Sequence, residues 1–312
     1  TQTKSMSQIR KKSKIAIVIL NWNGYEDTSE CIISLKKITY DNYQIVVVDN
    51  GSIQDDYLLL KKNFSDIEVV RSESNLGFTG GNNLGIENAM KMNPDYFLLL
   101  NNDTTVEPDF IQRLLDVFEK EKNAGIAAPQ INYFYEPEKI WTVGGKISRL
   151  RGSGFDDSDQ IYNSTKSEIR LVTFVSGCCM LIRREVLEKI GLFDENFFLY
   201  IEDADLCCRT TKAGYKIVVN NHSKIFHKVS SSTKANLSSL PLYYATRNRL
   251  YFAKKNFPNF FILTLVYISL AMMIKSVYWS FSKNSKNILM INRAFKDFFS
   301  KRMGKSNSLS FK

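Results

Sequence analysis

The chain has 312 residues, of which 44% are hydrophobic, and a formal net charge of +10. This is an ordinary globular composition, long enough for one large domain or two. The five cysteines, Cys31 and the adjacent pairs at 178–179 and 207–208, form no spaced CxxC motif or Cys/His cluster, which argues against a disulfide framework and a structural zinc site.

Charge is distributed unevenly along the chain. The part from Leu206 to Lys312 carries a net charge of +18, with Asp297 as its single acid, and the rest carries −8. Such one-sidedness indicates that one end faces a polyanion, either nucleic acid or an anionic membrane. The sequence has no RNP, zinc-finger or helix-turn-helix signature, so we expect a membrane surface and no nucleic acid as the partner.

The first 14 residues are polar and basic and contain no apolar core of a signal peptide. They are predicted to form a disordered or surface-bound arm. A reducing cytoplasm is the simplest compartment for a chain with this cysteine pattern.

Four short apolar runs without internal alternation follow, at 15–20, 44–49, 67–71 and 96–100. Runs of this kind are typical of strands that are covered on both faces. The segments between them have helical length, such as Glu26 to Ile38. The order therefore predicts an α/β fold with a mainly parallel sheet, flanking helices and right-handed crossovers.

Each of these runs ends in Asn, Asp and Gly residues. The endings are NWNG at 21–24, DNGS at 49–52, the glycine-rich stretch at 72–85 and NNDT at 101–104. Turn chemistry explains any one of them, since these residues dominate turns. Four in succession favour a polar ligand floor at the carboxyl ends of the strands, where open α/β sheets bind their ligands.

The second half is less regular. Residues 140–170 are predicted to be loop-rich, as a mobile flap or an acceptor-side loop. A strand is expected at 172–182, a helix at 183–191 and, after an acidic turn, a helix that ends near Gly214 before another strand. Long aromatic and basic helices follow. The predicted parts are an arm at 1–14, an α/β domain at 15–238 and a helical region at 239–312.

Asp103 follows a buried strand and is placed like a ligand for a hard cation such as Mg²⁺ or Mn²⁺. Asn101 and Asn102 offer amide groups to a neighbouring polar ligand. One carboxylate rarely holds such a metal alone, and diphosphate oxygens usually complete its shell. With the glycine-rich loop at 77–85, which matches neither a Walker loop nor GxGxxG, this indicates a nucleotide-diphosphate ligand.

A second acidic cluster contains Glu202, Asp203 and Asp205. Positions i and i+2 of a helix point to different faces, so we expect one carboxylate to face the cleft and the other to cap or form a salt bridge. Acids that complement a helix N-terminus are the alternative. The preceding FFLY run favours a low dielectric that tunes a carboxylate toward general-base duty.

The chain has two histidines. His222 lies in a polar stretch, NNHSK, and is predicted to be a surface residue in a turn. His227 follows an apolar run on an expected strand, where it is either a core histidine or a metal ligand through its neutral imidazole. Periodicity leaves both readings of His227 open.

Together the motifs carry a family resemblance. ILNWNG, VVVDNGS, NLGFTGGNNLG, LLLNNDT, SGCCMLIRREVLEKIGLFDENFF and YIEDADLCCR occur in this order. The set resembles family 2 glycosyltransferases of the GT-A fold, and most closely the bacterial and archaeal rhamnosyltransferase-like branch that builds surface polysaccharides. The resemblance covers 15–232, and YYATRNRLYF at 243–252 is similar to the same branch.

The resemblance implies an inverting, metal-dependent transfer from a nucleoside-diphosphate sugar, with dTDP- and UDP-sugars both compatible. Asp203 would be the general base, and Asp103 would bind the metal at the DxD-type position, where Asn101 replaces the commoner first Asp. His227 falls where related enzymes have a further metal ligand. Asp49 would hydrogen-bond the pyrimidine base. The remaining donor-side positions are Asn21, Asn23, Asn50, Gly51, Ser52, Asn75, Gly77, Phe78, Asn82 and Asn102.

An apolar run of 15 uncharged residues lies at 260–274, and Lys275 separates it from SVYWSF. A spanning helix needs about 20 apolar residues, so the run crosses a membrane only if Lys275 snorkels and the span extends to Phe281. The alternatives are a helix in the interface or one packed on protein. The basic flanks favour interfacial attachment at the cytoplasmic face, which suits a lipid-linked saccharide acceptor.

Two other functions compete with the transferase. A sugar-phosphate nucleotidylyltransferase would need a glycine-rich loop with Arg or Lys at the first strand, and NWNGYEDT is not such a loop. A non-catalytic nucleotide- or saccharide-binding membrane protein would be favoured by loss of Asp103 or Asp203, and both are present. Trp141 and the flap at 144–159 are expected either to contact the acceptor or to pack.

Overall fold

The computed structural model describes residues 12–156, 168–229, 239–282, 285–306 and 309. Most of the predicted arm and the end of the predicted flap therefore lie outside the described residues. A ten-stranded sheet forms the centre of the molecule, with strand order β10-β12-β6-β11-β4-β1-β2-β3, and with β5 and β7 paired to β12 and β6.

The strands of the sheet are β1 (Ile15–Asn21), β2 (Tyr43–Asp49), β3 (Glu68–Arg71), β4 (Tyr96–Asn101), β5 (Thr104–Val106), β6 (Ala124–Tyr133), β7 (Ile140–Thr142), β10 (Ile169–Val172), β11 (Cys179–Arg183) and β12 (Lys216–His227). A separate hairpin consists of β8 (Gly145–Ser148) and β9 (Ser153–Asp156).

The four predicted apolar runs are strands β1 to β4, and they pair in parallel. The sheet as a whole is mixed, because β11 runs antiparallel to β4 and β6 while β6 and β12 pair in parallel. In the register, Asn21 lies opposite Asp49, and Leu20 lies opposite Asn101. The polar residues that follow these strands therefore meet at one edge of the sheet.

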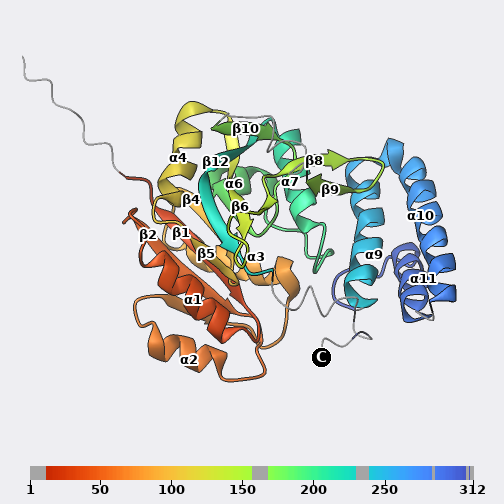
Figure 1. Ribbon diagram of the computed structural model, residues 1–312, viewed down its shortest axis with the longest axis horizontal. Helices are drawn as coiled ribbons and strands as arrows, with labels where there is room; N and C mark the ends of the chain where they lie inside the picture. Colours follow the sequence, from red (N-terminus) through yellow and green to blue (C-terminus); the bar gives the residue numbers. More distant parts are fainter. Residues whose placement is uncertain (1–11, 157–167, 230–238, 283–284, 307–308, 310–312) are drawn as a thin grey trace, which may run out of the picture.

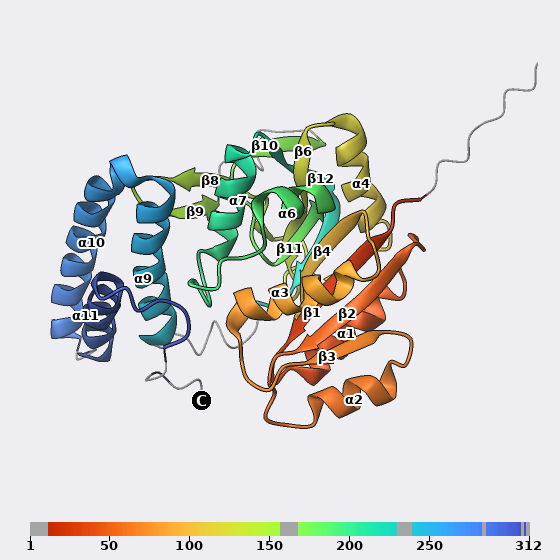
Figure 2. The same ribbon diagram turned by 180° about the vertical axis from the view of Figure 1, so that it is seen from behind.

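Both faces of the sheet are buried. On β1, Ile15, Ile17 and Ile19 belong to one core cluster, and Ala16 and Val18 belong to a second cluster on the opposite face. This is the reason why the strand is apolar at every position. Helices α1 (Tyr25–Leu35), α2 (Asp56–Asn63) and α4 (Phe110–Lys120) cover the first face, and α3 (Gly77–Met90), α6 (Arg184–Ile190) and α7 (Glu202–Lys212) cover the second, as Figures 1 and 2 show.

Two expectations about the second half were wrong. The run at 172–182 is not one strand, because β10 ends at Val172 and β11 begins at Cys179. The chain between them leaves the sheet to pair with Gly145, which exchanges backbone hydrogen bonds with Phe174. The supposedly loop-rich segment from 140 contains β7, β8 and β9, which at three or four residues each are too short to show a period.

His222 is exposed, as predicted, but it lies within β12 rather than in a turn. The polar NNHSK stretch is where the pairing of β12 with β6 shifts register, between Asn220 and Lys224. A β-bulge produced the turn-like sequence signal.

The C-terminal helices are α9 (Ser239–Asn256), the short 3₁₀ helix η1 (Pro258–Phe260), α10 (Phe261–Phe281) and α11 (Ser285–Phe299). In both views they stand together beyond the β8–β9 hairpin at one end of the sheet, and α9 contacts α7 and β9 (Figures 1 and 2). The expected domain boundary at 238 lies outside the described residues, so the division into domains stays a prediction.

Candidate functional site

The ends of β1 and β2 form a buried polar cluster around Asn21. The amide nitrogen of Asn21 donates to Asp49 Oδ1 at 3.2 Å and to Ser52 Oγ at 3.2 Å. It also reaches Asp56 Oδ2 at 3.0 Å, and Thr28 Oγ1 donates to Asn21 Oδ1 at 2.7 Å. All five side chains are buried. Asn21 thus fixes the cluster from its centre.

Asp49 is fully buried, and its Oδ2 atom has no hydrogen-bond partner within the described residues. Arg71 forms an ion pair with this oxygen, and its Nε atom lies 3.6 Å away. A buried carboxylate oxygen without a hydrogen bond is costly, so this atom marks a place where a ligand N–H is expected. The N3–H groups of uracil and thymine are donors of this kind.

Asn23 lies apart from the buried cluster. Its side chain is exposed and accepts a hydrogen bond from Ile53 N at 2.8 Å, while its backbone N–H donates to Ser52 Oγ at 2.9 Å. The structure therefore places Asn23 at the rim, where it holds the loop after β2. Asn102, the residue after β4, joins the cluster through a 2.9 Å hydrogen bond that its amide nitrogen donates to Thr28 Oγ1.

Asn50 connects β2 to the glycine-rich loop. Its amide nitrogen donates to Gly77 O at 3.1 Å and to Asn75 Oδ1 at 3.3 Å, and its oxygen accepts from Leu76 N at 2.9 Å. Gly51 and Gly77 both have positive φ, and a Cβ on Gly77 would lie 2.3 Å from Phe198 O. The loop consequently packs directly on the chain that leads into α7.

The stretch at 77–85 was expected to be a loop, but it is the first part of α3, which begins at Gly77. Two of its residues differ in their surroundings. Phe78 packs edge-on against Phe193, and its backbone N–H donates to Phe198 O at 2.8 Å. Asn82 is buried inside α3, where its amide nitrogen bonds to Phe78 O one turn earlier. Asn82 therefore uses its donor on its own helix.

Asp103 and His227 are brought together by strand pairing, although 124 positions separate them. β5 follows Asp103 directly and pairs with β12 so that Thr104 lies opposite His227, and Lys228 N donates to Asp103 O at 2.9 Å. As a result His227 Nε2 lies 3.1 Å from Asp103 Oδ1. The Trp141 ring meets the His227 ring edge-on at 4.6 Å, so Trp141 packs against the pair.

The surroundings of His227 have opposing effects on the pKa of its imidazole. Burial lowers the pKa of the imidazole, whereas Cys178 and the Asp103 carboxylate raise it, and the net effect raises the pKa to about 10. Its Nδ1 atom is buried without a hydrogen-bond partner in the described part of the chain. Because a metal ligand must be the neutral imidazole, metal binding here would release a proton.

The donor set fits a divalent cation that also binds its substrate. Asp103 and His227 supply one oxygen and one nitrogen ligand, and no group of three His, Cys, Asp or Glu residues that could hold a metal occurs among the described residues. Two protein ligands leave most of the coordination shell to other atoms, such as diphosphate oxygens and water. The pair therefore suits a metal that arrives with a phosphorylated ligand.

Asp203 lies at the start of α7 and faces the loop between β10 and β11. Its Oδ2 accepts a hydrogen bond from Gly177 N at 3.2 Å, and its Oδ1 accepts one from Ala204 N at 2.7 Å. Burial raises the pKa of Asp203 to about 6, although these backbone donors lower it. Burial and the neighbouring Asp203 charge also raise the pKa of Glu202 well above its usual range. Asp203 is thus poised to exchange a proton near neutral pH.

Asp205 has different surroundings, as the helix spacing predicted. It is fully buried and bonds to Arg209 Nε at 2.8 Å, Lys255 Nζ at 2.9 Å and Asn256 Nδ2 at 2.8 Å. These partners satisfy its charge and attach α7 to α9. Asp205 therefore has a structural role. Asp203 accepts hydrogen bonds only from backbone N–H groups and has no cationic partner among the described residues.

Sequence reasoning missed the residues that hold the chain before α7. Phe198, Tyr200 and Ile201 all have positive φ, which costs free energy for residues with bulky side chains. Asn248 on α9 donates to the carbonyls of three residues in this segment, at 2.8 to 2.9 Å. Its neighbour Arg247 contacts the carbonyls of residues 196 and 197. The only signal was the YYATRNRLYF motif, whose role its residue types do not reveal.

Comparisons with known proteins show the family of the chain. The model of the family "Glycosyl transferase family 2" matches residues 16–191, more than half of the chain. The hexosyltransferase Agl10 of low-salt glycan biosynthesis in Haloferax volcanii is 26% identical over 245 residues, which cover 75% of this chain and 74% of that protein.

Two rhamnosyltransferases are similar to the chain as well. The N-acetylglucosaminyl-diphospho-decaprenol L-rhamnosyltransferase of Mycobacterium tuberculosis is 24% identical over 70% of this chain and 77% of its own length. The dTDP-rhamnosyl transferase RfbF of Shigella flexneri is 26% identical over 78% of this chain and 81% of its own length.

Solved structures identify the fold. A mannosyltransferase of Pyrobaculum calidifontis, in complex with GDP-Man and Mn²⁺, aligns with a TM-score of 0.56 at 10% identity, over 94% of this chain and 89% of its own. GalNAc-T7 with UDP, GalNAc and Mn²⁺ aligns with a TM-score of 0.56 at 19% identity, over 69% of this chain and 43% of its own. The fold is GT-A, and the chain belongs to glycosyl transferase family 2.

Proposed function

We propose that the protein transfers a sugar, with inversion, from a pyrimidine nucleoside-diphosphate sugar to a saccharide or lipid-linked saccharide in cell-surface polysaccharide synthesis. Rhamnose is the first candidate, because two relatives are rhamnosyltransferases by name. The Asp49 oxygen that accepts no hydrogen bond within the described residues supports a uracil or thymine base, and so a UDP- or dTDP-sugar.

One observation carries the proposal: residues 177 and 178 connect the Asp203 carboxylate to the Asp103 turn. Gly177 N donates to Asp203, and the next carbonyl, Cys178 O, accepts from Asn101 N at 2.9 Å. A Cβ on Gly177 would also lie 3.0 Å from the Phe78 ring. A base, a metal-binding pair and the donor loop are therefore neighbours at one edge of the sheet.

Asp103 and His227 would hold Mg²⁺ or Mn²⁺ together with the diphosphate of the donor. A divalent cation at this position neutralises the charge that develops on the leaving diphosphate. Asn21, Asn50 and Ser52 keep the end of β2 in place, so that Asp49 can orient the base of the nucleotide.

Asp203 performs the proton transfer. Its ionised carboxylate accepts the proton of an acceptor hydroxyl as that oxygen bonds to the anomeric carbon, while the bond from this carbon to the diphosphate breaks. One displacement from the side opposite the leaving group inverts the anomeric configuration. A pKa near 6 leaves Asp203 ionised at neutral pH and basic enough to help.

Helix α10 supports attachment to a membrane surface. The stretch Pro258–Phe281, which consists of η1 and α10, is long and apolar enough to cross a membrane by length and composition. However, Thr264, Ile268 and Met272 on one side pack inward, and Thr264 Oγ1 donates to Arg149 O at 2.7 Å. The opposite side exposes Ile262, Val266, Leu270, Met273, Ile274, Val277 and Phe281. A helix that is packed on one side and apolar on the other suits the plane of the cytoplasmic interface.

The test is sugar transfer by the purified protein to a set of saccharide and lipid-linked saccharide acceptors, with Mn²⁺ and a dTDP- or UDP-sugar. NMR of the product gives its anomeric configuration. The proposal expects a product whose configuration is opposite to that of the donor. A product with retained configuration would contradict the role of Asp203 as base, because retention needs a second displacement.

A further inference from the structure

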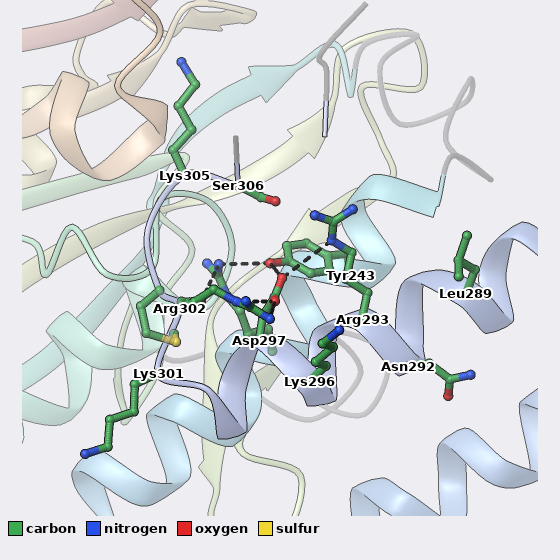
Figure 3. A pocket seen from close by; sticks show the side chains of 12 residues that line it. Tyr243, Leu289, Asn292, Arg293, Lys296, Asp297, Lys301, Arg302, Lys305 and Ser306 are labelled. Atoms are coloured by element: carbon green, nitrogen blue, oxygen red, sulfur yellow. Dashed lines mark hydrogen bonds and ion pairs between the residues drawn. The ribbon is translucent and has the colours of Figure 1, made fainter. Parts of the chain in front are cut away.

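A basic cavity lies in the C-terminal region, outside the site described above. Its volume is about 800 Å³, and α9, α11 and the segment at 301–306 line it (Figure 3). Its basic side chains come from Arg247, Arg293, Lys296, Lys301, Arg302 and Lys305.

The single acid of the cavity is already paired. Asp297 accepts hydrogen bonds from Tyr243 Oη at 2.7 Å and from Arg302 Nε at 2.9 Å, and Arg293 Nε lies 3.6 Å away (Figure 3). Burial raises the pKa of Asp297, but these partners lower it further, and the net pKa lies below its usual range. Asp297 therefore balances only part of the positive charge around the cavity.

Arg247 is the strongest indication of an anion. It lines the cavity with only 1% of its surface exposed, beneath the rings of Tyr243 and Tyr244. Its guanidinium contacts neutral acceptors, such as Tyr243 Oη at 3.3 Å and the carbonyl of Arg302 at 3.4 Å. No carboxylate of the described residues forms an ion pair with it. A buried guanidinium without a counter-ion is costly, so an anion in the cavity would relieve that cost.

The cavity also adjoins both halves of the proposed site. Lys305 donates to Asn75 O of the donor loop at 2.9 Å. Arg247 reaches the carbonyl of Phe197, and Tyr244 stacks on Phe198, just before the segment that leads to Asp203. An anion bound here would lie near the donor loop and near the segment that leads to Asp203.

We propose that this cavity binds the diphosphate of a lipid-linked saccharide acceptor. The inference rests on the proposed function and specifies its acceptor. The diphosphate would sit among the basic side chains, and its sugar would point toward Asp203. The donor diphosphate has its own place at the strand ends, beside Asp103 and His227.

A phospholipid headgroup is the competing source of the same chemistry. Basic side chains on an open surface suffice for attraction to an anionic leaflet. Here a buried arginine and a buried tyrosine form part of the lining, and the cavity connects to two loops of the transferase site. These features favour the acceptor, which must reach that site, over a lipid that only anchors the protein.

The test uses the full chain with Lys296→Glu and Lys301→Glu combined. Both side chains are exposed and line the cavity. The control is Lys286→Glu, an exposed lysine of α11 outside the cavity. Calorimetry measures binding of geranyl diphosphate in EDTA, so that no metal directs the probe to the donor site. Kinetics compare KM for a lipid-diphosphate acceptor with KM for a phosphate-free alkyl glycoside of the same sugar.

We expect geranyl diphosphate to bind the wild-type and Lys286→Glu proteins alike, and the double variant on the order of tenfold or more weakly, since charge-assisted contacts to phosphate are lost. In the double variant, KM for the diphosphate acceptor should rise by a similar factor, while KM for the glycoside should change much less. Lys296→Gln, which removes one charge without reversing it, should show a smaller change in the same direction and serves if the double variant does not fold.

Equal binding of geranyl diphosphate by the double variant and the wild type would overturn the inference. So would a selective loss of binding to phosphatidylglycerol vesicles in the double variant with geranyl diphosphate binding retained, which would assign the cavity to phospholipid. Failure of the proposed function would look different: the wild-type protein would transfer sugar to neither acceptor, while calorimetry would still report on the cavity.

Discussion

The strand ends of the sheet and the helices of the C-terminal region hold the site in different ways. At the strand ends, backbone pairing brings residues together, as when β5 and β12 place Asp103 beside His227. The C-terminal region acts through side chains instead, as when Asn248 on α9 binds three carbonyls of the segment before α7.

The two regions therefore differ in what fixes the positions of their functional residues. The sheet positions its residues by a register that no single side chain maintains. The segment before α7, which leads to Asp203, has three residues with positive φ, and such strain persists only when neighbouring structure enforces it. We therefore expect substitutions at the strand ends to affect ligand binding and chemistry, and substitutions in the C-terminal helices to affect the position of Asp203 and the stability of the fold.

Asp203→Asn should lower kcat by about 100-fold to 10,000-fold, because the amide cannot accept the proton of the acceptor. Donor binding, measured by calorimetry with Mn²⁺, should stay close to the wild-type value. The comparison is Asp205→Asn, which should lower the melting temperature by removing a buried, triply paired carboxylate. If Asp203→Asn turned over nearly as fast as wild type, the base would have to be another residue.

Asp103→Ala should weaken metal-dependent donor binding by at least about 10-fold to 100-fold, since even loss of an outer-shell partner of a metal costs that much. His227→Ala should act in the same direction, and His222→Ala, on the exposed bulge of the same strand, should not. Calorimetric titration of metal and donor provides the measurement. An unchanged metal titration in Asp103→Ala would remove Asp103 from the metal site.

Asn248→Ala should reduce both stability and kcat. Loss of the amide leaves buried carbonyls without donors, which costs about 1–3 kcal/mol of unfolding free energy. If Asn248 positions Asp203, the pH profile of kcat should also move, because Asp203 would sit in a wetter environment with a lower pKa. A variant that is less stable but keeps the wild-type pH profile would show that Asn248 is only structural.

The pKa of Asp203 predicts opposite pH trends for activity and stability. Between its ordinary value of 3.8 and its folded value of about 6, the folded state binds more protons at this residue than the unfolded state. The Asp203 contribution to stability must therefore fall as pH rises through this window. Activity must rise through the same window, as the carboxylate ionises.

The checks for this prediction are urea denaturation and kcat at pH 4.5 to 7 in wild type and Asp203→Asn. The unfolding free energy of wild type minus that of Asp203→Asn should fall as pH rises across the window. A constant difference would mean that the pKa of Asp203 is not raised.

The smallest effect is expected at the apolar side of α10. Leu270→Glu with Ile274→Glu should reduce sedimentation with anionic vesicles and leave transfer to a soluble glycoside intact. Leu171→Glu, at an exposed apolar position of β10, is the control. Undiminished vesicle binding by the double variant would place the membrane contact elsewhere.

The sequence predicted the parallel part of the sheet and the order of its polar endings, because an apolar run followed by Asn, Asp and Gly is a local pattern. It also separated Asp203 from Asp205 by helical spacing. It did not predict β5 or the β8–β9 hairpin, whose strands are too short to show a period, and it read 172–182 as one strand because the buried residues there lie in a loop. Asp56 contacts Asn21, and Asn248 contacts the segment before α7. These partners are distant in the sequence, so no local sequence pattern predicts the contacts.

The most direct measurement is the release of nucleoside diphosphate by the purified protein from a panel of nucleoside-diphosphate sugars, with and without Mg²⁺ or Mn²⁺. Metal-dependent release from one pyrimidine nucleotide sugar, absent in Asp103→Ala, is the result expected. No release and no calorimetric binding across the panel would contradict the account and indicate a non-catalytic protein built on the same fold.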